Sequence, residues 1–488
     1  MSVGASGHRA GWLALGALMT AYAAVFFVFY PPISGVEDEI GFLNQTRVWM
    51  LGAVSTEGAE LPYPLHDFIE TNGRHVPARH PGRSLAALPF WAAGGGRAVF
   101  ASGLALHLLM TAAGGATLAR LGRSPLWAVL LLFHPTLAVY SRTVMADGPA
   151  GGALLLAALA VVCDAPIAAG LAVGLAAAMR YHSALALPLV AATFIYPHEG
   201  AAEDRGRRWK RAGLCLLAGA FAGSVLVAYN LAVYHAPNEP FTARRGKFDA
   251  ENFLPHVGFY ALSLMAIWPG MLLAPVLDRS RLRWLTRGVI VVFLGPLLFY
   301  YFHDRAPGLL ETLILGQRLI QVALPLWVVS YAGVLDDWLA RPVRNRIGGV
   351  VWGALVTIVC LGLLGANAFA SSRHQAHLKA LAETRDALLA AVPEGSLIVH
   401  NGPAFKVSLR PDGVQAYHVV PLESAGLPVY DPTKFLSGLD AEPRPWFLVC
   451  LKKSFDEAMT TYFQEVVARY RMKPVPTRSP LLTVYRTP

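Results

Sequence analysis

The sequence predicts a polytopic α-helical membrane protein that carries an α/β domain at its C-terminal end. Hydrophobic residues make up 55% of the 488 positions and charged residues only 15%, too few polar side chains to cover a soluble protein of this length. Apolar runs long enough to cross a bilayer recur up to about residue 369. The polar residues that follow alternate between strand-like and helix-like patterns, which is typical of an α/β domain.

Roughly eleven segments are long and apolar enough to be counted as membrane spans. They cover residues 11–32, 98–119, 125–141, 148–163, 165–180, 183–197, 212–235, 257–277, 288–302, 318–336 and 347–369. The first of them lacks a small-residue cleavage site, so we interpret it as a retained span and not as a removed signal peptide.

Basic residues indicate which side of the membrane each turn faces, because Lys and Arg accumulate in cytoplasmic loops. One set of alternate turns contains Arg9; Arg120 and Arg123; Arg205, Arg207, Arg208, Lys210 and Arg211; Arg279, Arg281, Arg283 and Arg287; Arg341, Arg344 and Arg346. This set predicts a cytoplasmic N-terminus, with the first long loop and the C-terminal tail outside. The same turns carry much of the net charge of +10, which makes nucleic acid an improbable partner.

Two units follow from this pattern. Residues 1–369 form the membrane-embedded unit, whose first outer loop, 33–97, is long. Segment 84–93 of that loop is apolar but too short to cross, so we expect it to lie in the membrane interface or to re-enter. Residues 370–488 form the outer α/β domain. It is predicted to contain helices at 374–391 and 455–469 and strands at 396–400, 416–420, 445–450 and 481–485.

Three consecutive acids, residues 37–39, come directly after the first span. A helix that starts here places Asp38, Phe42, Gln45 and Trp49 on one face. A carboxylate on that face, at the outer membrane surface, could act as general base on an acceptor hydroxyl or amine. The structural alternative is that the acids only complement the N-terminal dipole of this helix.

Asp147 is a second candidate acid on the outer side. It lies in the tight turn Ser141–Pro149 between the third and fourth predicted spans. An Asp that precedes Gly-Pro is a good helix N-cap, which is the structural explanation. Because the turn faces the same side as Asp38, Asp147 is also a candidate site residue.

Several arginines lie on the outer side, against the general charge bias. Arg180, which Tyr181 follows, ends one span, and Arg318 begins another; Arg83 lies in the first loop. Guanidinium groups suit phosphate and pyrophosphate, so these residues are candidates for binding a lipid phosphate. The alternative is that they extend to lipid headgroups without a specific role.

A divalent metal site is a further candidate in the first loop. His75 and His80 lie near Asp67 and Glu70, but their spacing matches no established metal motif. The four cysteines show no CxxC spacing and predict neither a disulfide framework nor a cysteine metal site. The sequence also lacks a Gly-rich nucleotide loop and a Gly-x-Ser-x-Gly motif.

These features together resemble the GT-C superfamily of integral-membrane glycosyltransferases, in particular the branch of protein O-mannosyltransferases and lipid A aminoarabinose transferases. That branch has an Asp-Glu pair at the start of its first outer loop, matched by Asp38-Glu39, and then an aromatic residue and an arginine, matched by Phe42 and Arg47. Looser matches are Arg79–Arg83, Ser141–Pro149, Gly174–Tyr181 and Arg318–Pro325. The aminoarabinose transferases carry Glu-Lys-Pro-Pro where this chain has Arg-His-Pro-Gly-Arg, a departure that concerns the donor and the metal site of that subgroup.

The resemblance implies an inverting glycosyltransferase that moves a hexose or a pentose from a polyprenyl-phosphate donor to a lipid, glycan or protein acceptor. Asp38 would deprotonate the acceptor, supported by Glu39 or Asp147. The leaving phosphate needs positive charge rather than a protonated acid. The residues assigned to it are Arg83, Arg180, Tyr181 and Arg318.

Two other functions remain open at this point. One is a polysaccharide polymerase or ligase, although such enzymes usually place their large loop late in the chain. The other is a transporter or flippase of lipid-linked sugars, although transporters carry ionisable residues near mid-membrane and often show paired halves. The abundance of Ala, Gly and Arg is typical of a high-GC bacterium and predicts a cytoplasmic (inner) membrane location with the tail in the periplasm or its equivalent.

Overall fold

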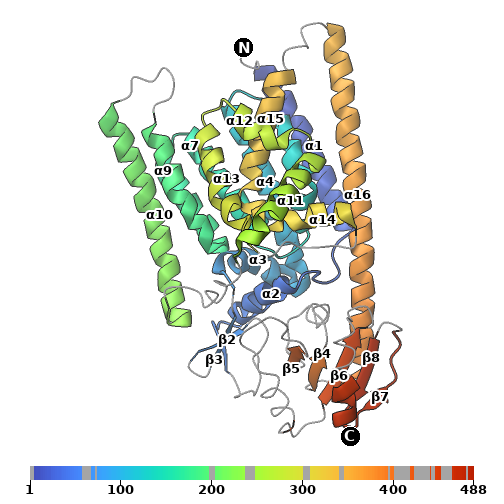
Figure 1. Ribbon diagram of the computed structural model, residues 1–488. Coiled ribbons are helices and arrows are strands. Elements are labelled where there is room, and N and C mark those ends of the chain that lie inside the picture. The colour runs from blue at the N-terminus through green and yellow to red at the C-terminus, as the bar shows by residue number, and fades with distance from the viewer. Residues whose placement is uncertain are drawn as a thin grey trace.

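Helices dominate the first 393 residues of the computed structural model (Figure 1). The structure describes residues 5–57, 68–71, 74–77, 79–196, 204–236, 248–300, 308–339, 346–393, 396–400, 418–421, 440, 446–451, 464–479 and 482–488. A bundle of helices forms one part, and a small sheet lies beyond the C-terminal end of the longest helix (Figure 1). The helices are those of a polytopic membrane protein.

Each predicted span coincides with one or more helices within the described residues, but many of these helices are broken or short. Within the described ranges, four helices are long and apolar enough to cross a membrane, or six if two bent pairs each count as one span. The four helices are α1 (Ala5–Val28), α4 (Phe100–Arg120), α10 (Arg205–Tyr234) and α16 (Arg346–Ala391). The predicted number of about eleven is therefore not reached by length and composition alone.

The two bent pairs lie late in the bundle. In the first, α11 (Phe253–Ile267) is followed by η5 (Met271–Leu273) and α12 (Ala274–Leu277), at an angle of 111°. In the second, α14 (Leu309–Leu315) and η6 (Gly316–Val322) meet α15 (Leu324–Leu339) at 101°. This second bend brings η6, which carries Arg318, into the interior of the bundle.

Prolines explain several of the remaining breaks. The predicted span 125–141 consists of η1 (Pro125–Ala128), α5 (Val129–Leu132) and α6 (Pro135–Tyr140), two of which begin with proline. Proline suits the first turn of a helix but cannot continue a preceding one. The other apolar helices are α7 (Asp147–Val162), α8 (Pro166–Met179), η2 (Tyr181–Ala186), α9 (Leu187–Ile195) and α13 (Arg283–Leu297).

One large apolar core holds the bundle together. It joins residues of α1, α4, α5, α7, α8, α9, α13 and α15, among them Leu131, Leu155 and Val329. By contrast, only 17% of the apolar window of α10 and 6% of that of α16 is buried. These two helices flank the bundle on opposite sides (Figure 1), so their apolar faces are left for lipid.

The loop at 33–97, predicted to be the first outer loop, is more structured in its described residues than the sequence indicated. It begins with α2 (Glu37–Met50), continues through a small antiparallel sheet of β1 (Thr56–Glu57), β3 (Arg74–Pro77) and β2 (Phe68–Thr71), and ends with α3 (Pro81–Ala98). The apolar segment 84–93 lies within α3, whose helical geometry breaks at Gly94 and Gly95. Phe42 and Ala87 belong to the buried cluster that also includes residues of the 141–146 turn.

The sheet after α16 has five strands. Its order is β5 (His418–Pro421), β4 (Leu397–His400), β6 (Trp446–Leu451), β8 (Leu482–Arg486) and β7 (Lys473–Val475). The first three strands run parallel and the last two are antiparallel. β4, β5, β6 and β8 lie where strands were expected; β7 was not predicted. A short helix at 464–469 falls within the predicted 455–469, of which the preceding residues lie outside the described ranges.

The long helix α16 touches the membrane bundle near the start of the first outer loop. Gln375 Nε2 donates to the carbonyl oxygen of Tyr30 at 3.2 Å, and Arg142 Nη1 donates to Ser371 Oγ at 3.3 Å. At its other end, Leu388 enters a small apolar core with strand residues such as Phe447 and Val484. One continuous helix therefore connects the bundle with the C-terminal sheet (Figure 1).

Candidate active site

Five charged side chains meet at the end of the bundle that carries the first outer loop. They are Asp38 of α2, Arg79 before α3, Asp147 at the start of α7, Arg180 at the end of α8 and Arg318 of η6. We call this group the Asp–Arg cluster. Each member comes from a different element, so the cluster exists only in the folded protein.

Asp38 carries an arginine on each carboxylate oxygen. Arg79 Nη2 donates to Oδ1 at 3.1 Å, and Arg318 Nη2 donates to Oδ2. Burial alone would raise the pKa of the Asp38 carboxyl, but Arg318, Arg79 and Arg180 outweigh burial and hold that pKa well below its usual range. The Asp38 side chain is 31% exposed, whereas those of Arg79 and Arg318 are only 10% exposed. The Asp38 carboxylate is therefore the part of the cluster that is most accessible from solvent.

Asp147 lies deeper. Its side chain is 3% exposed and accepts a hydrogen bond from Arg180 Nη2 at 2.6 Å. Arg318 Nε lies 3.8 Å from the same Asp147 oxygen, so Arg318 bridges the two acids. The expected N-cap role is not what the structure has, because α7 begins at Asp147 itself and no side chain caps it. The carboxylate turns toward the arginines instead.

Glu39 is fully buried and braces the loop. Its Oε2 accepts from the backbone N–H groups of Gly35 at 2.8 Å and Val36 at 2.9 Å, and its Oε1 accepts from Val144 N–H at 2.6 Å. The structural explanation considered for the acidic triplet thus applies to Glu39, which satisfies helix N-terminal donors. Burial raises the pKa of Glu39 to about 7 in spite of these donors.

Arg83 also supports the 141–146 turn. It is fully buried; its Nε donates to the Met145 carbonyl at 3.1 Å, Nη2 to the Thr143 carbonyl at 3.3 Å and Nη1 to Ser102 Oγ at 2.8 Å. Burial lowers the pKa of this guanidinium to about 10. All three nitrogens of this guanidinium are thus engaged with protein groups, and the donor role predicted for Arg83 stays a prediction.

Of the remaining predicted residues, Tyr181 and His80 follow Arg180 and Arg79 in the chain. Tyr181 donates its hydroxyl to Asn230 Oδ1 at 2.7 Å, and its ring meets that of His80 edge-on at 4.3 Å. For the proposed metal, the His75 and Glu70 side chains and all of Asp67 lie outside what the structure describes. Among the described residues, no group of three or more His, Cys, Asp or Glu could hold a metal ion.

Arg79 is the cluster member that sequence reasoning did not assign. Its carbonyl accepts from Gln45 Nε2 at 2.9 Å and from the Tyr234 hydroxyl at 3.3 Å. The next residues approach α8 closely, since a Cβ on Gly82 would lie 2.7 Å from the Ala178 carbonyl carbon, a contact that only glycine permits. The shared helix face of Asp38 and Gln45 was the sequence signal that could have pointed to this loop.

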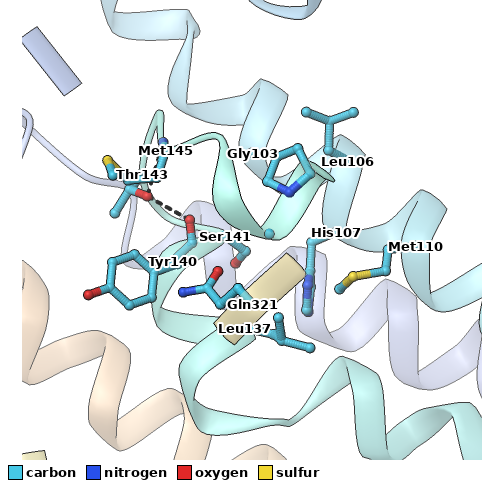
Figure 2. Close-up of a pocket in the computed structure, with 12 residues that line it drawn as sticks. Gly103, Leu106, His107, Met110, Leu137, Tyr140, Ser141, Thr143, Met145 and Gln321 are labelled. Carbon is cyan, nitrogen blue, oxygen red and sulfur yellow. Dashed lines mark hydrogen bonds between the residues drawn. The ribbon is translucent and has the colours of Figure 1, made fainter. Parts of the chain in front are cut away.

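A small cavity lies between α4, α6, the start of α7 with its preceding turn, and η6 (Figure 2). It measures about 20 Å³, counted as the space open to the centre of a water molecule. That is room for about one ordered water. Gln321 lines it, is fully buried and, among the described residues, has a hydrogen-bond partner for neither amide atom.

Arginines outnumber carboxylates among the described residues of the cluster, where three arginines meet two acids. Arg180 Nε is buried without a hydrogen-bond partner in the described part of the chain. Several guanidinium groups gathered in one site suit binding of a phosphate. The Asp38 carboxylate at the open edge supplies a base within the same site.

Solved structures similar to the chain in fold include those of two proteins. ArnT from Cupriavidus metallidurans, bound to undecaprenyl phosphate or in the apo state, matches with a TM-score of 0.57 at 14% identity over 98% of both chains. The apo oligosaccharyltransferase from Archaeoglobus fulgidus matches with a TM-score of 0.50 at 11% identity, over 90% of this chain and 69% of its own. No family model and no curated protein sequence matches the chain. At these identities the likeness concerns the fold alone, and the chain has a fold similar to those of ArnT and of the archaeal oligosaccharyltransferase.

Proposed function

We propose that the protein is an inverting glycosyltransferase that takes a sugar from a polyprenyl-phosphate donor and transfers it to an acceptor at the outer face of a bacterial inner membrane. The observation that carries this proposal is the Asp–Arg cluster, in which a partly exposed carboxylate shares a site with three arginines. The match to ArnT bound to undecaprenyl phosphate supports the choice of a polyprenyl lipid. The N-terminus would be cytoplasmic, and both the first loop and the 370–488 domain would lie outside.

The reaction assigns one role to each charged group. Asp38 removes the proton from the acceptor hydroxyl or amine as that atom attacks the anomeric carbon of the sugar. The bond between the anomeric carbon and the phosphate oxygen breaks, and its electron pair stays with the phosphate. Arg318 and Arg180 stabilise the negative charge that develops there. Because attack and departure occur on opposite faces, the anomeric configuration inverts.

Asp147 and Glu39 act as supports in this scheme. Asp147 is almost completely buried and holds Arg180, so it orients the phosphate-binding group without reaching an acceptor. Glu39 fixes the start of α2 to the turn before Asp147 through three backbone N–H groups. The distance between the base and the arginines is thereby set by two buried acids.

A transfer assay tests the proposal. The purified protein in nanodiscs is incubated with synthetic polyprenyl-phosphate sugars and with an extract of lipids, glycans and proteins from a bacterial envelope. We expect release of polyprenyl phosphate together with a labelled, acid-stable product in one of the acceptor fractions. Movement of the intact donor across a sealed bilayer, without any product, would support a flippase instead. Extension of a glycan chain by a whole oligosaccharide would support a polymerase or ligase.

A further inference from the structure

Asp38 and a donor phosphate need the same groups. Both oxygens of the Asp38 carboxylate already accept hydrogen bonds, one from Arg79 and one from Arg318. A phosphate bound in the cluster would take up the guanidinium groups of these arginines. At the same time, a carboxylate neutralised by two guanidinium groups is a poor base. The site without donor therefore holds its proposed base in an inactive pairing.

We propose that the donor phosphate displaces Asp38 from Arg79 and Arg318, so that Arg79 becomes a phosphate ligand and Asp38 is released to act as base. This inference rests on the proposed function and adds an order of events to it. The donor binds first, and only then does Asp38 turn toward the acceptor. An acceptor that arrives before the donor meets a carboxylate that is still paired.

The two acids of the cluster differ in how they are placed. The pairing of Asp38 with its arginines can be exchanged for a phosphate, whereas the pairing of Asp147 with Arg180 is kept. Asp38 is 31% exposed and lies at the edge, whereas Asp147 is 3% exposed and keeps Arg180 at 2.6 Å. Arg318 contacts Asp38 through Nη2 and approaches Asp147 through Nε. It can therefore exchange Asp38 for a phosphate oxygen while Nε remains next to Asp147, and η6 need not move.

Arg79 is placed for the same exchange. Its backbone carbonyl is fixed by Gln45 of α2 and Tyr234 of α10, and only its side chain extends to Asp38. The guanidinium lies 5.6 Å from the centre of the Phe42 ring, on the same helix as Asp38. A fixed backbone with a long side chain lets the charge shift from the carboxylate to a neighbouring oxygen at little cost in conformational entropy.

Competition for shared arginines fixes the direction in which phosphate affinity changes when the Asp38 charge is removed. If Asp38 and the phosphate exclude one another from Arg79 and Arg318, removal of the Asp38 charge must strengthen phosphate binding. A residue that merely supports the fold of the site would have the opposite effect, since its loss weakens binding. The same variant therefore loses catalysis and gains affinity, a combination that structural damage does not produce.

The experiment measures binding of polyprenyl phosphate to the full-length protein in nanodiscs, by native mass spectrometry titration. For Asp38→Asn and Asp38→Ala we expect dissociation constants lower than that of the wild type by at least about fivefold. Arg79→Gln is expected to bind about tenfold more weakly, as expected for loss of a charge-assisted hydrogen bond. The matched control is Glu311→Gln, an exposed carboxylate on α14 outside the cluster, which should leave the affinity unchanged.

Each outcome has one meaning. Unchanged or weaker binding by both Asp38 variants, while the wild type binds, overturns the exchange and leaves the proposed function standing. Absence of binding to the wild type itself overturns the proposed function. If the Asp38 variants do not fold, cryo-electron microscopy of the wild type with polyprenyl phosphate decides. Phosphate oxygens on Arg79 and Arg318 with Asp38 turned away support the exchange, and Asp38 still paired with both arginines refutes it.

Discussion

Asp38 and Arg318 stand 280 positions apart in the chain and form a direct ion pair, with Arg318 Nη2 as donor and Asp38 Oδ2 as acceptor. The pair joins the first outer loop to the bent segment before α15. Because Arg318 also approaches Asp147, one side chain connects the acid assigned as base with the acid that lies at the start of α7. A change at Arg318 should therefore affect donor binding, the base and its support together.

Asp38→Asn is expected to abolish transfer while the protein stays folded. The amide keeps the shape of the side chain but cannot accept the acceptor's proton, and loss of a general base lowers the rate by about 100-fold or more. Turnover is measured with saturating donor and acceptor, beside the Glu311→Gln control. Wild-type turnover by a folded Asp38→Asn protein would remove Asp38 as the base.

Arg318→Ala is expected to weaken donor binding more than acceptor binding. Loss of a guanidinium that holds a phosphate raises the dissociation constant of polyprenyl phosphate about 10- to 100-fold. Arg318→Lys should recover only part of this loss, because an ammonium group lacks the planar, multidentate shape by which a guanidinium contacts the phosphate and Asp147 together. Native mass spectrometry gives the donor affinity. An affinity equal to that of the wild type would leave Arg318 with a purely structural role.

Arg83→Ala is expected to destabilise the protein rather than to alter donor affinity. The change removes three buried hydrogen bonds to the 143–145 backbone and Ser102, which we expect to lower the free energy of unfolding by about 3 kcal/mol or more. Thermal unfolding of the detergent-solubilised protein gives the comparison. Arg97→Ala, at an exposed arginine on the same helix, is the control. Equal melting temperatures for the two variants would contradict the bracing role.

Glu39 predicts a dependence of stability on pH. Burial raises its pKa from 4.5 to about 7 in the folded protein, so the folded state binds more protons than the unfolded state between these values. The contribution of this group is fully present below pH 4.5 and is lost as the pH rises through about 7. Glu39→Gln should lower stability at every pH, because its amide NH₂ opposes a backbone N–H, and should remove this part of the slope. An unchanged slope, followed by thermal unfolding from pH 5 to 8, would refute the assignment.

We predict that the buried Gln321 amide binds an ordered water molecule in the cavity of Figure 2. A buried amide without a protein partner is costly unless water satisfies it, and the cavity has room for about one molecule. We expect density within hydrogen-bond distance of Gln321 in a high-resolution structure. Gln321→Leu should then lower the melting temperature, since the water loses a partner. A dry cavity together with a stabilised Leu variant would show that the amide is simply unsatisfied.

The fold could be predicted from the sequence because hydrophobicity is local. Each predicted span is a run of apolar residues, and the strands β4, β6 and β8 are short runs of alternating or continuous apolar residues between polar segments. The breaks inside the spans depend on packing as well as on proline. The 101° bend before α15 has no local signal that sets its angle. The strands of the first loop are two to four residues long, too short for a pattern to appear.

The candidate site could be predicted only in part. Asp38, Asp147, Arg180 and Arg318 were each selected for their position at an outer end of a span, and the structure brings the four together; their roles remain predictions. Arg83 and Arg79 are four positions apart in one turn, yet one is buried against backbone and the other reaches Asp38. Which of two neighbouring arginines faces the site depends on tertiary contacts that residue type and spacing do not reveal.

Helix α16 connects the membrane bundle with the C-terminal sheet as one unbroken helix. Its 46 residues span about 69 Å at 1.5 Å per residue, more than twice the hydrocarbon thickness of about 30 Å. No break interrupts it between the bundle and the C-terminal sheet, and Gln375 couples it to Tyr30 near the start of the first outer loop. A force on the sheet, such as that exerted by a large bound acceptor, would therefore be transmitted along α16 to the backbone that precedes Asp38. A glycine-rich hinge inserted into the helix would prevent this transmission.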